Sequence, residues 1–135
     1  MTDAHVQHHI DLLRYLRQVL QTLAEEDVVP EEHQGFITRY DELIEHMRQG
    51  GDDRYLGQEL VSQVFQRYPQ IAHQVPRDLL WFFGGECLHF MPDDEIAKYQ
   101  LLEERRFAAL EQGKAFDWDA EVRLMFLPVA GQSKH

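Results

Sequence analysis

Cysteine is almost absent from the sequence, because Cys87 is the only one among 135 residues. One cysteine excludes an intramolecular disulfide and a multi-cysteine zinc site, and it is compatible with a reducing compartment. Long apolar runs are also lacking. The longest, residues 79–83, is far too short to cross a bilayer, and the first ten residues lack the basic-then-apolar pattern of a signal peptide. We therefore expect a cytoplasmic protein with no membrane segment.

Positive charge is scarce as well. The chain has 13 lysine and arginine residues against 24 acidic ones, and its formal net charge is −11. A nucleic-acid-binding protein normally carries a basic stripe, so we expect no nucleic-acid partner. HExxH, GxSxG, P-loop and paired CxxC motifs are all absent. With no complete catalytic set, the sequence favours a protein without enzymatic activity of its own.

Helical periodicity is what the sequence does contain. Apolar residues recur at helical spacing almost throughout, and no stretch of four or more residues alternates as a half-buried strand would. The length suits one domain that buries roughly two thirds of its unfolded surface. We predict an all-α fold: a compact antiparallel bundle of five main helices and a short C-terminal helix. It should occupy residues 1–127 as a single domain, with 128–135 as a flexible tail.

Proline, glycine and acidic residues set the expected boundaries. The first helix should span about residues 3–23, and Pro30 and Pro92 should each begin a helix, with acidic residues in its first turn. Asp52 or Asp53 can cap the third helix. The later helices should end at Gly50-Gly51, Pro69, Gly113 and Pro128. Apolar spacing places Phe107 and Leu110 on the inner face of the fifth helix.

The first predicted helix has an unusually wide apolar face. One stripe comprises Val6, Ile10, Leu13, Leu16, Leu20 and Leu23, and a second comprises Leu12, Tyr15 and Val19. Together they cover roughly 220° of the circumference, so a second packing surface is required, either inside the protein or on a partner. We predict an interface at Leu12, Tyr15, Leu16 and Val19. The leading hypothesis is a small interaction or regulatory protein, as a homodimer or with a protein partner.

The stretch LLWFFGGECLHFMP lies in a helix predicted near residues 76–91, which is apolar nearly all round and should be central. Glu86 and His89 are three apart, share one side, and could partly satisfy each other. Cys87 cannot reach His89 on a continuous helix and is expected in the core.

Two adjacent glycines in this stretch form part of a candidate ligand-binding site. Mid-helix glycines cost about 1 kcal/mol each, so Gly84 and Gly85 indicate close packing, a kink or a contact with a ligand. Whether the helix continues through them stays open. The candidate ligand-binding residues are Gly84, Gly85, Glu86 and His89.

The alternative hypothesis is a metal- or ligand-binding helical-bundle enzyme. Glu-x-x-His is the spacing by which di-iron and di-manganese bundles supply two ligands from one helix, and only Glu86 and His89 provide it. Glu42, Glu45 and His46 could complete a site for a divalent transition metal as cofactor. Without such a site, no cofactor is expected.

Three histidines, His5, His8 and His9, open the first helix inside its apolar sector. His5 and His9 are four apart and could hold a metal, although such clusters at a chain end are more often incidental. A further hypothesis places them at the end of a dimer interface. Association would then weaken as the pH falls through the histidine range.

Overall fold

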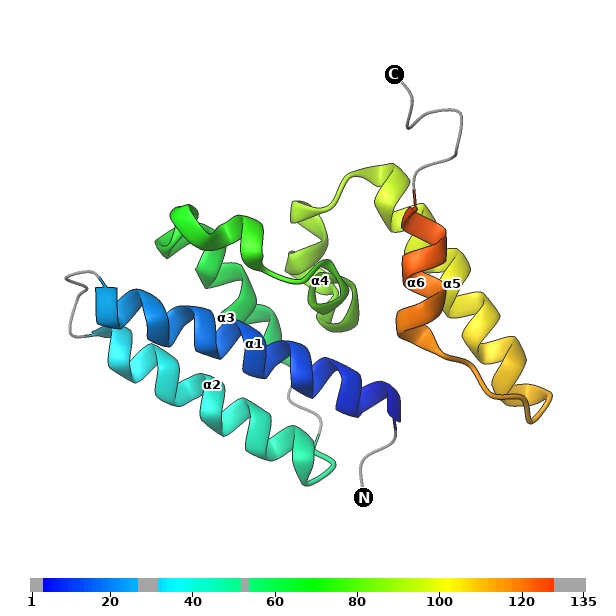
Figure 1. Ribbon diagram of the computed structural model, residues 1–135, viewed down its shortest axis with the longest axis horizontal. Helices are drawn as coiled ribbons and strands as arrows, with labels where there is room; N and C mark the ends of the chain where they lie inside the picture. The colour runs from blue at the N-terminus through cyan, green and yellow to red at the C-terminus, as the bar shows by residue number, and fades with distance from the viewer. Residues whose placement is uncertain (1–3, 27–31, 52–53, 128–135) are drawn as a thin grey trace. The chain divides into compact units, whose positions relative to one another are not determined.

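The computed structural model describes residues 4–26, 32–51 and 54–127. This part of the chain is all-α, as predicted, and contains no strand (Figure 1). No helix in it is both long and apolar enough to span a membrane. The elements are α1 (Ala4–Glu26), α2 (Glu32–Arg48), α3 (Arg54–Arg67), the 3-10 helix η1 (Pro69–Gln74), α4 (Arg77–Phe83), the 3-10 helix η2 (Gly85–Phe90), α5 (Asp93–Glu111) and α6 (Trp118–Phe126).

The chain divides into two compact units, Met1–Met91 and Pro92–His135, where the sequence predicts one domain over residues 1–127. The division falls where Met91 adopts an extended conformation and Pro92 begins the next helix. Proline has no backbone N–H and cannot continue the preceding helix. The predicted tail, residues 128–135, and the predicted helix starts at Pro30, Asp52 and Asp53 lie outside the described residues.

In the first unit, α1 and α2 lie side by side and antiparallel (Figure 1), and α1 also packs against α4 and η1. Part of its second packing surface is therefore internal, while Tyr15 on the second stripe stays 49% exposed. The fully buried hydrophobic residues of the two helices are Ile10, Leu13, Leu16, Leu20, Ile37, Tyr40 and Leu43. Leu16 was expected in an interface, and this expectation is wrong because its side chain is completely enclosed by its own unit.

A buried histidine joins three segments of this unit. The Nε2 of His33 lies 2.9 Å from the carbonyl oxygen of Leu20, and its Nδ1 lies 2.8 Å from the hydroxyl of Tyr68. A carbonyl oxygen can only accept a hydrogen bond, so Nε2 donates to it. Nδ1 of the neutral ring then accepts a hydrogen bond from the hydroxyl of Tyr68. One imidazole thus connects α1, α2 and the residue that precedes η1, with both of its nitrogens satisfied.

The predicted helix near residues 76–91 is broken at Gly84. Gly84 has φ 65° and ψ −149°, a backbone conformation that side-chain-bearing residues rarely adopt, and α4 ends at Phe83. The chain continues as η2, in which Cys87 is buried while Glu86 and His89 are exposed. The glycine pair is therefore a break in the helix, a question that the sequence left open, and Cys87 occupies the core position expected of it.

The side chain of Phe83 on α4 packs directly on the backbone of α3 at Gly57. A Cβ atom added there would lie 2.1 Å from the ring of Phe83, far inside van der Waals contact. Gly57 and Phe83 are both buried, so α3 and α4 can pack closely only because residue 57 has no side chain. No local pattern in the sequence marks this role of Gly57.

The second unit is a pair of antiparallel helices, α5 and α6 (Figure 1). Tyr99, Leu102 and Trp118 are buried, and the carboxylate of Asp117 caps α6 by accepting a hydrogen bond from the N–H of Ala120 at 3.1 Å. The expectation that Phe107 and Leu110 face inward is wrong, since they are 54% and 58% exposed. The nine residues of α6 are too few to cover the nineteen of α5.

Replacing Gly57 by alanine should destabilise the protein by about 1–3 kcal/mol, because the new methyl group would overlap the Phe83 ring. The matched control is Gly35→Ala on α2, where an added Cβ meets nothing within 4 Å. That change should stabilise the protein by up to about 1 kcal/mol through helix propensity. Urea denaturation measures both free energies of unfolding, and an equal effect of the two substitutions would contradict the close α3–α4 packing.

Tyr68→Phe should lower the free energy of unfolding by about 1–3 kcal/mol, since it leaves the buried Nδ1 of His33 without its hydrogen-bond donor. Tyr55→Phe removes the same hydroxyl from a side chain that is 84% exposed and should change stability by less than about 0.5 kcal/mol. Thermal or urea unfolding of both variants provides the comparison. Equal losses would show that the His33 hydrogen bond contributes nothing of its own.

Candidate functional site

The residues predicted to hold a metal lie at the surface: Glu42, Glu45, His46, Glu86 and His89 are all exposed. Glu45 accepts from Arg48 at 2.8 Å on its own helix. Glu86 and His89 lie in η2, after the break at Gly84, and both are exposed to solvent. The internal pocket that the enzyme hypothesis requires at these residues is therefore not formed, and Gly84 and Gly85 act as a helix break there.

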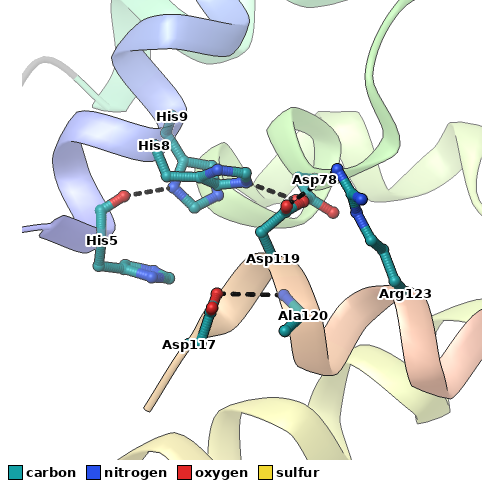
Figure 2. Close-up of polar contacts among 8 residues, drawn as sticks. All are labelled: His5, His8, His9, Asp78, Asp117, Asp119, Ala120 and Arg123. Carbon is teal, nitrogen blue, oxygen red and sulfur yellow. Dashed lines mark hydrogen bonds and ion pairs between the residues drawn. The ribbon is translucent and has the colours of Figure 1, made fainter. Parts of the chain in front are cut away.

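The structure instead brings together His8 and His9 of α1 with Asp78 of α4 (Figure 2). The Nε2 of His8 lies 2.8 Å from the Oδ2 of Asp78, and one ligand atom from each of the three residues lies within 4.8 Å of the others. His9 is fully buried, and the side chains of His8 and Asp78 are 22% and 11% exposed. The three residues are thus mostly buried, and the side chain of His8 is the most exposed of them.

Helix geometry explains why these side chains meet. Asp78 and Phe82 are four apart on α4 and share one face, as do His5 and His9 on α1. The ring of His9 stacks on that of Phe82, with centroids 4.1 Å apart and planes inclined by 16°. This contact holds the His9 ring in place, while Asp78 on the same face of α4 reaches His8.

The protonation state of His9 is set by its surroundings. Its Nδ1 lies 2.8 Å from the carbonyl oxygen of His5, so Nδ1 donates and the lone pair of the neutral ring is on Nε2 (Figure 2). Burial lowers the pKa of His9 from 6.5 to about 3, and the charges of His5 and His8 act in the same direction. His9 is therefore neutral at neutral pH, which is the form in which imidazole binds a metal ion.

Two imidazoles and one carboxylate are donors that suit first-row divalent transition metals. The sequence singled out the histidines but not Asp78, which is 70 residues away from His8 along the chain. No local pattern marks Asp78, because its role depends on how α4 packs on α1. Covalent catalysis by Cys87 is not supported, since its thiol is buried beside Ser62 and burial raises the pKa of the Cys87 thiol.

A shallow groove lies between α1 and η1, toward the other end of α1. It encloses about 240 Å³ and is lined by Tyr15, Gln18, Val19, Thr22, Leu23, Ile71 and Gln74. Two of the predicted interface residues, Tyr15 and Val19, are among them. Leu12, half-buried, shares their face of α1. Three of the four residues predicted for an interface are therefore accessible at or beside this groove.

Comparison with known protein families gives a match over nearly the whole chain. The model of the PA2817-like family matches residues 1–134. The chain belongs to this family. No curated protein and no solved structure matches this PA2817-like chain. Its function has to be argued from its own residues.

The buried His9 should make this PA2817-like protein sensitive to acid. Because its pKa of about 3 in the folded state lies below the 6.5 of the unfolded chain, the unfolded state binds the proton first. The stability that neutral His9 contributes is therefore complete above pH 6.5 and is lost as the pH falls from 6.5 toward 3. His9→Phe keeps a ring against Phe82 and has no proton to bind.

We expect the free energy of unfolding of the unaltered protein to fall by roughly 2–3 kcal/mol more than that of His9→Phe between pH 7 and pH 4. Urea denaturation in the presence of a chelator measures this difference. The neighbouring titratable groups, His5, His8 and Asp78, are present in both proteins. Parallel pH profiles would contradict this prediction, because they would show that the pKa of His9 is the same in the folded and unfolded states.

Proposed function

We propose that this protein is a small interaction protein, without catalytic activity of its own, that forms a homodimer through one face of α1 and η1. This face, the α1–η1 face, comprises Leu12, Tyr15, Gln18, Val19, Thr22 and Gln74. The observation that carries the proposal is its lack of negative charge in a strongly acidic chain. The cytoplasmic location stays a prediction from the sequence.

The charge distribution along the chain is uneven at this face. Residues 12–24 and residues 60–77 contain no aspartate or glutamate, although the chain has 24 acidic residues. These two stretches supply every residue that lines the groove. A chain of net charge −11 repels its own copies over most of its surface, so a second copy can approach most easily where carboxylates are missing.

The shape and composition of the face suit a symmetric contact. In a two-fold dimer the same surface patch meets itself, so a patch of one charge sign would oppose pairing and a neutral patch permits it. Tyr15 is 49% exposed at the edge of the groove, and tyrosine is among the residues enriched in interface cores. Each copy therefore offers both an exposed aromatic ring and a groove of about 240 Å³ that could receive one.

The basic side chains near this face are few and partly neutralised. Arg17 contacts Asp41 of α2 at 2.8 Å, and Arg14 lies 3.7 Å from Asp11 on its own helix. The face thus has no strong positive field that would select an acidic protein instead of a second copy. An acidic partner is the competing occupant, and the oligomeric state distinguishes the two.

Val19→Glu should weaken self-association by at least about tenfold, because it places two like charges in a symmetric contact. Thr38→Glu, which adds the same charge to an exposed position on α2, should leave association unchanged. Sedimentation equilibrium over a wide concentration range measures the dissociation constants. A monomeric mass of the unaltered protein at the highest concentration would overturn the homodimer, and equal weakening by both variants would place the contact elsewhere.

A further inference from the structure

We propose that His8, His9 and Asp78 form a binding site for a divalent first-row transition metal ion, of which Zn²⁺ is the simplest example. The site lies near the start of α1, whereas the α1–η1 face begins at Leu12 and extends toward the other end of the helix. The inference does not depend on self-association, and either proposal can fail without the other.

The direction of the donors supports the site. His9 donates its Nδ1 proton to the carbonyl oxygen of His5, so the lone pair of the neutral ring is on Nε2, the nitrogen that would coordinate an ion. Metal-binding histidines usually donate their second ring nitrogen to a carbonyl or carboxylate in this manner, which fixes the tautomer and the ring orientation. The stacking on Phe82 restrains the same ring. His9 is thus an oriented donor before any ion binds.

The spacing of the donors is close to that of a coordinated ion. Zinc–ligand bonds of about 2.0–2.1 Å in a tetrahedral site place neighbouring donor atoms about 3.3 Å apart. Here His8 and Asp78 are 2.8 Å apart, and no pair in the cluster exceeds 4.8 Å. Binding would require movements of roughly 1.5 Å or less. His8 and Asp78, whose side chains are partly exposed, have the freedom to make them.

The plain alternative is that His8 and Asp78 form only an ion pair between α1 and α4. That reading accounts for two of the three residues. Coordination of a metal ion would engage all three residues, whose ligand atoms lie within 4.8 Å of one another. Three protein donors would also leave a coordination position for water, as in zinc sites that are not closed by a fourth residue.

The test uses the untagged full chain, stripped with a chelator and titrated with Co²⁺ by visible absorption, followed by competition with Zn²⁺. We expect one equivalent to bind, with the d–d bands of cobalt bound to nitrogen and oxygen, and a rise in melting temperature. His8→Ala and Asp78→Asn should each weaken metal binding by at least about tenfold. Removing a residue that only hydrogen-bonds to a metal-binding side chain already costs about that much affinity. Circular dichroism shows whether each variant is folded. Because the side chain of His8 is the more exposed of the two, His8→Ala should disturb the fold less than Asp78→Asn.

The matched control is the double variant Glu86→Gln/His89→Ala, which removes a histidine and a carboxylate that are both exposed. It should bind cobalt as the unaltered chain does. Absence of binding up to millimolar metal would overturn the proposal, as would unchanged affinity in folded His8→Ala and Asp78→Asn. Loss of affinity in the control alone would move the site to η2.

Discussion

The first unit depends on one constraint: α1 has to bury an apolar sector that exceeds half of its circumference. A single neighbouring helix cannot cover so wide a face. The structure resolves this by placing α2 on one side of α1, and α4 with η1 on the other. Both features with a functional interpretation follow from that arrangement. The contact with α4 brings Asp78 to His8, and the incomplete contact with η1 leaves the groove beside Tyr15.

A second constraint, the break at Gly84, decides which polar side chains can act together. The sequence predicted a continuous, central helix to residue 91, in which Glu86 and His89 would share one side. In a 3-10 helix residues three apart still share one side, and in η2 that side faces solvent. The same break shortens α4 to seven residues, all of which lie before the glycine pair. Asp78 is therefore the carboxylate that α4 contributes to the interior.

The helical fold could be predicted from sequence because its signals are local. Apolar spacing and the positions of Pro69, Pro92 and Gly113 predicted the order of the helices and most of their ends. What could not be predicted depends on contacts between elements. Phe107 and Leu110 have the spacing of an inner face but lie beyond the reach of the short α6. Gly57 has no local signature, and only the position of Phe83 shows why it lacks a side chain.

The sequence pointed to the histidines of the candidate site but not to its aspartate, because acidic residues are abundant in this chain. Clustered histidines are noticed in any chain, whereas one aspartate among 24 acidic residues is not. Among the acidic residues whose burial the structure describes, Asp78 alone is buried, and a buried carboxylate is costly unless a cation or a donor lies beside it. His8 supplies that donor in this structure, at 2.8 Å. A divalent metal ion would satisfy the same carboxylate and would also be coordinated by Nε2 of His9. The buried carboxylate of Asp78 needs a hydrogen-bond donor or a cation beside it, and this need explains its contact with His8. The same need favours a divalent cation at the cluster in our proposal.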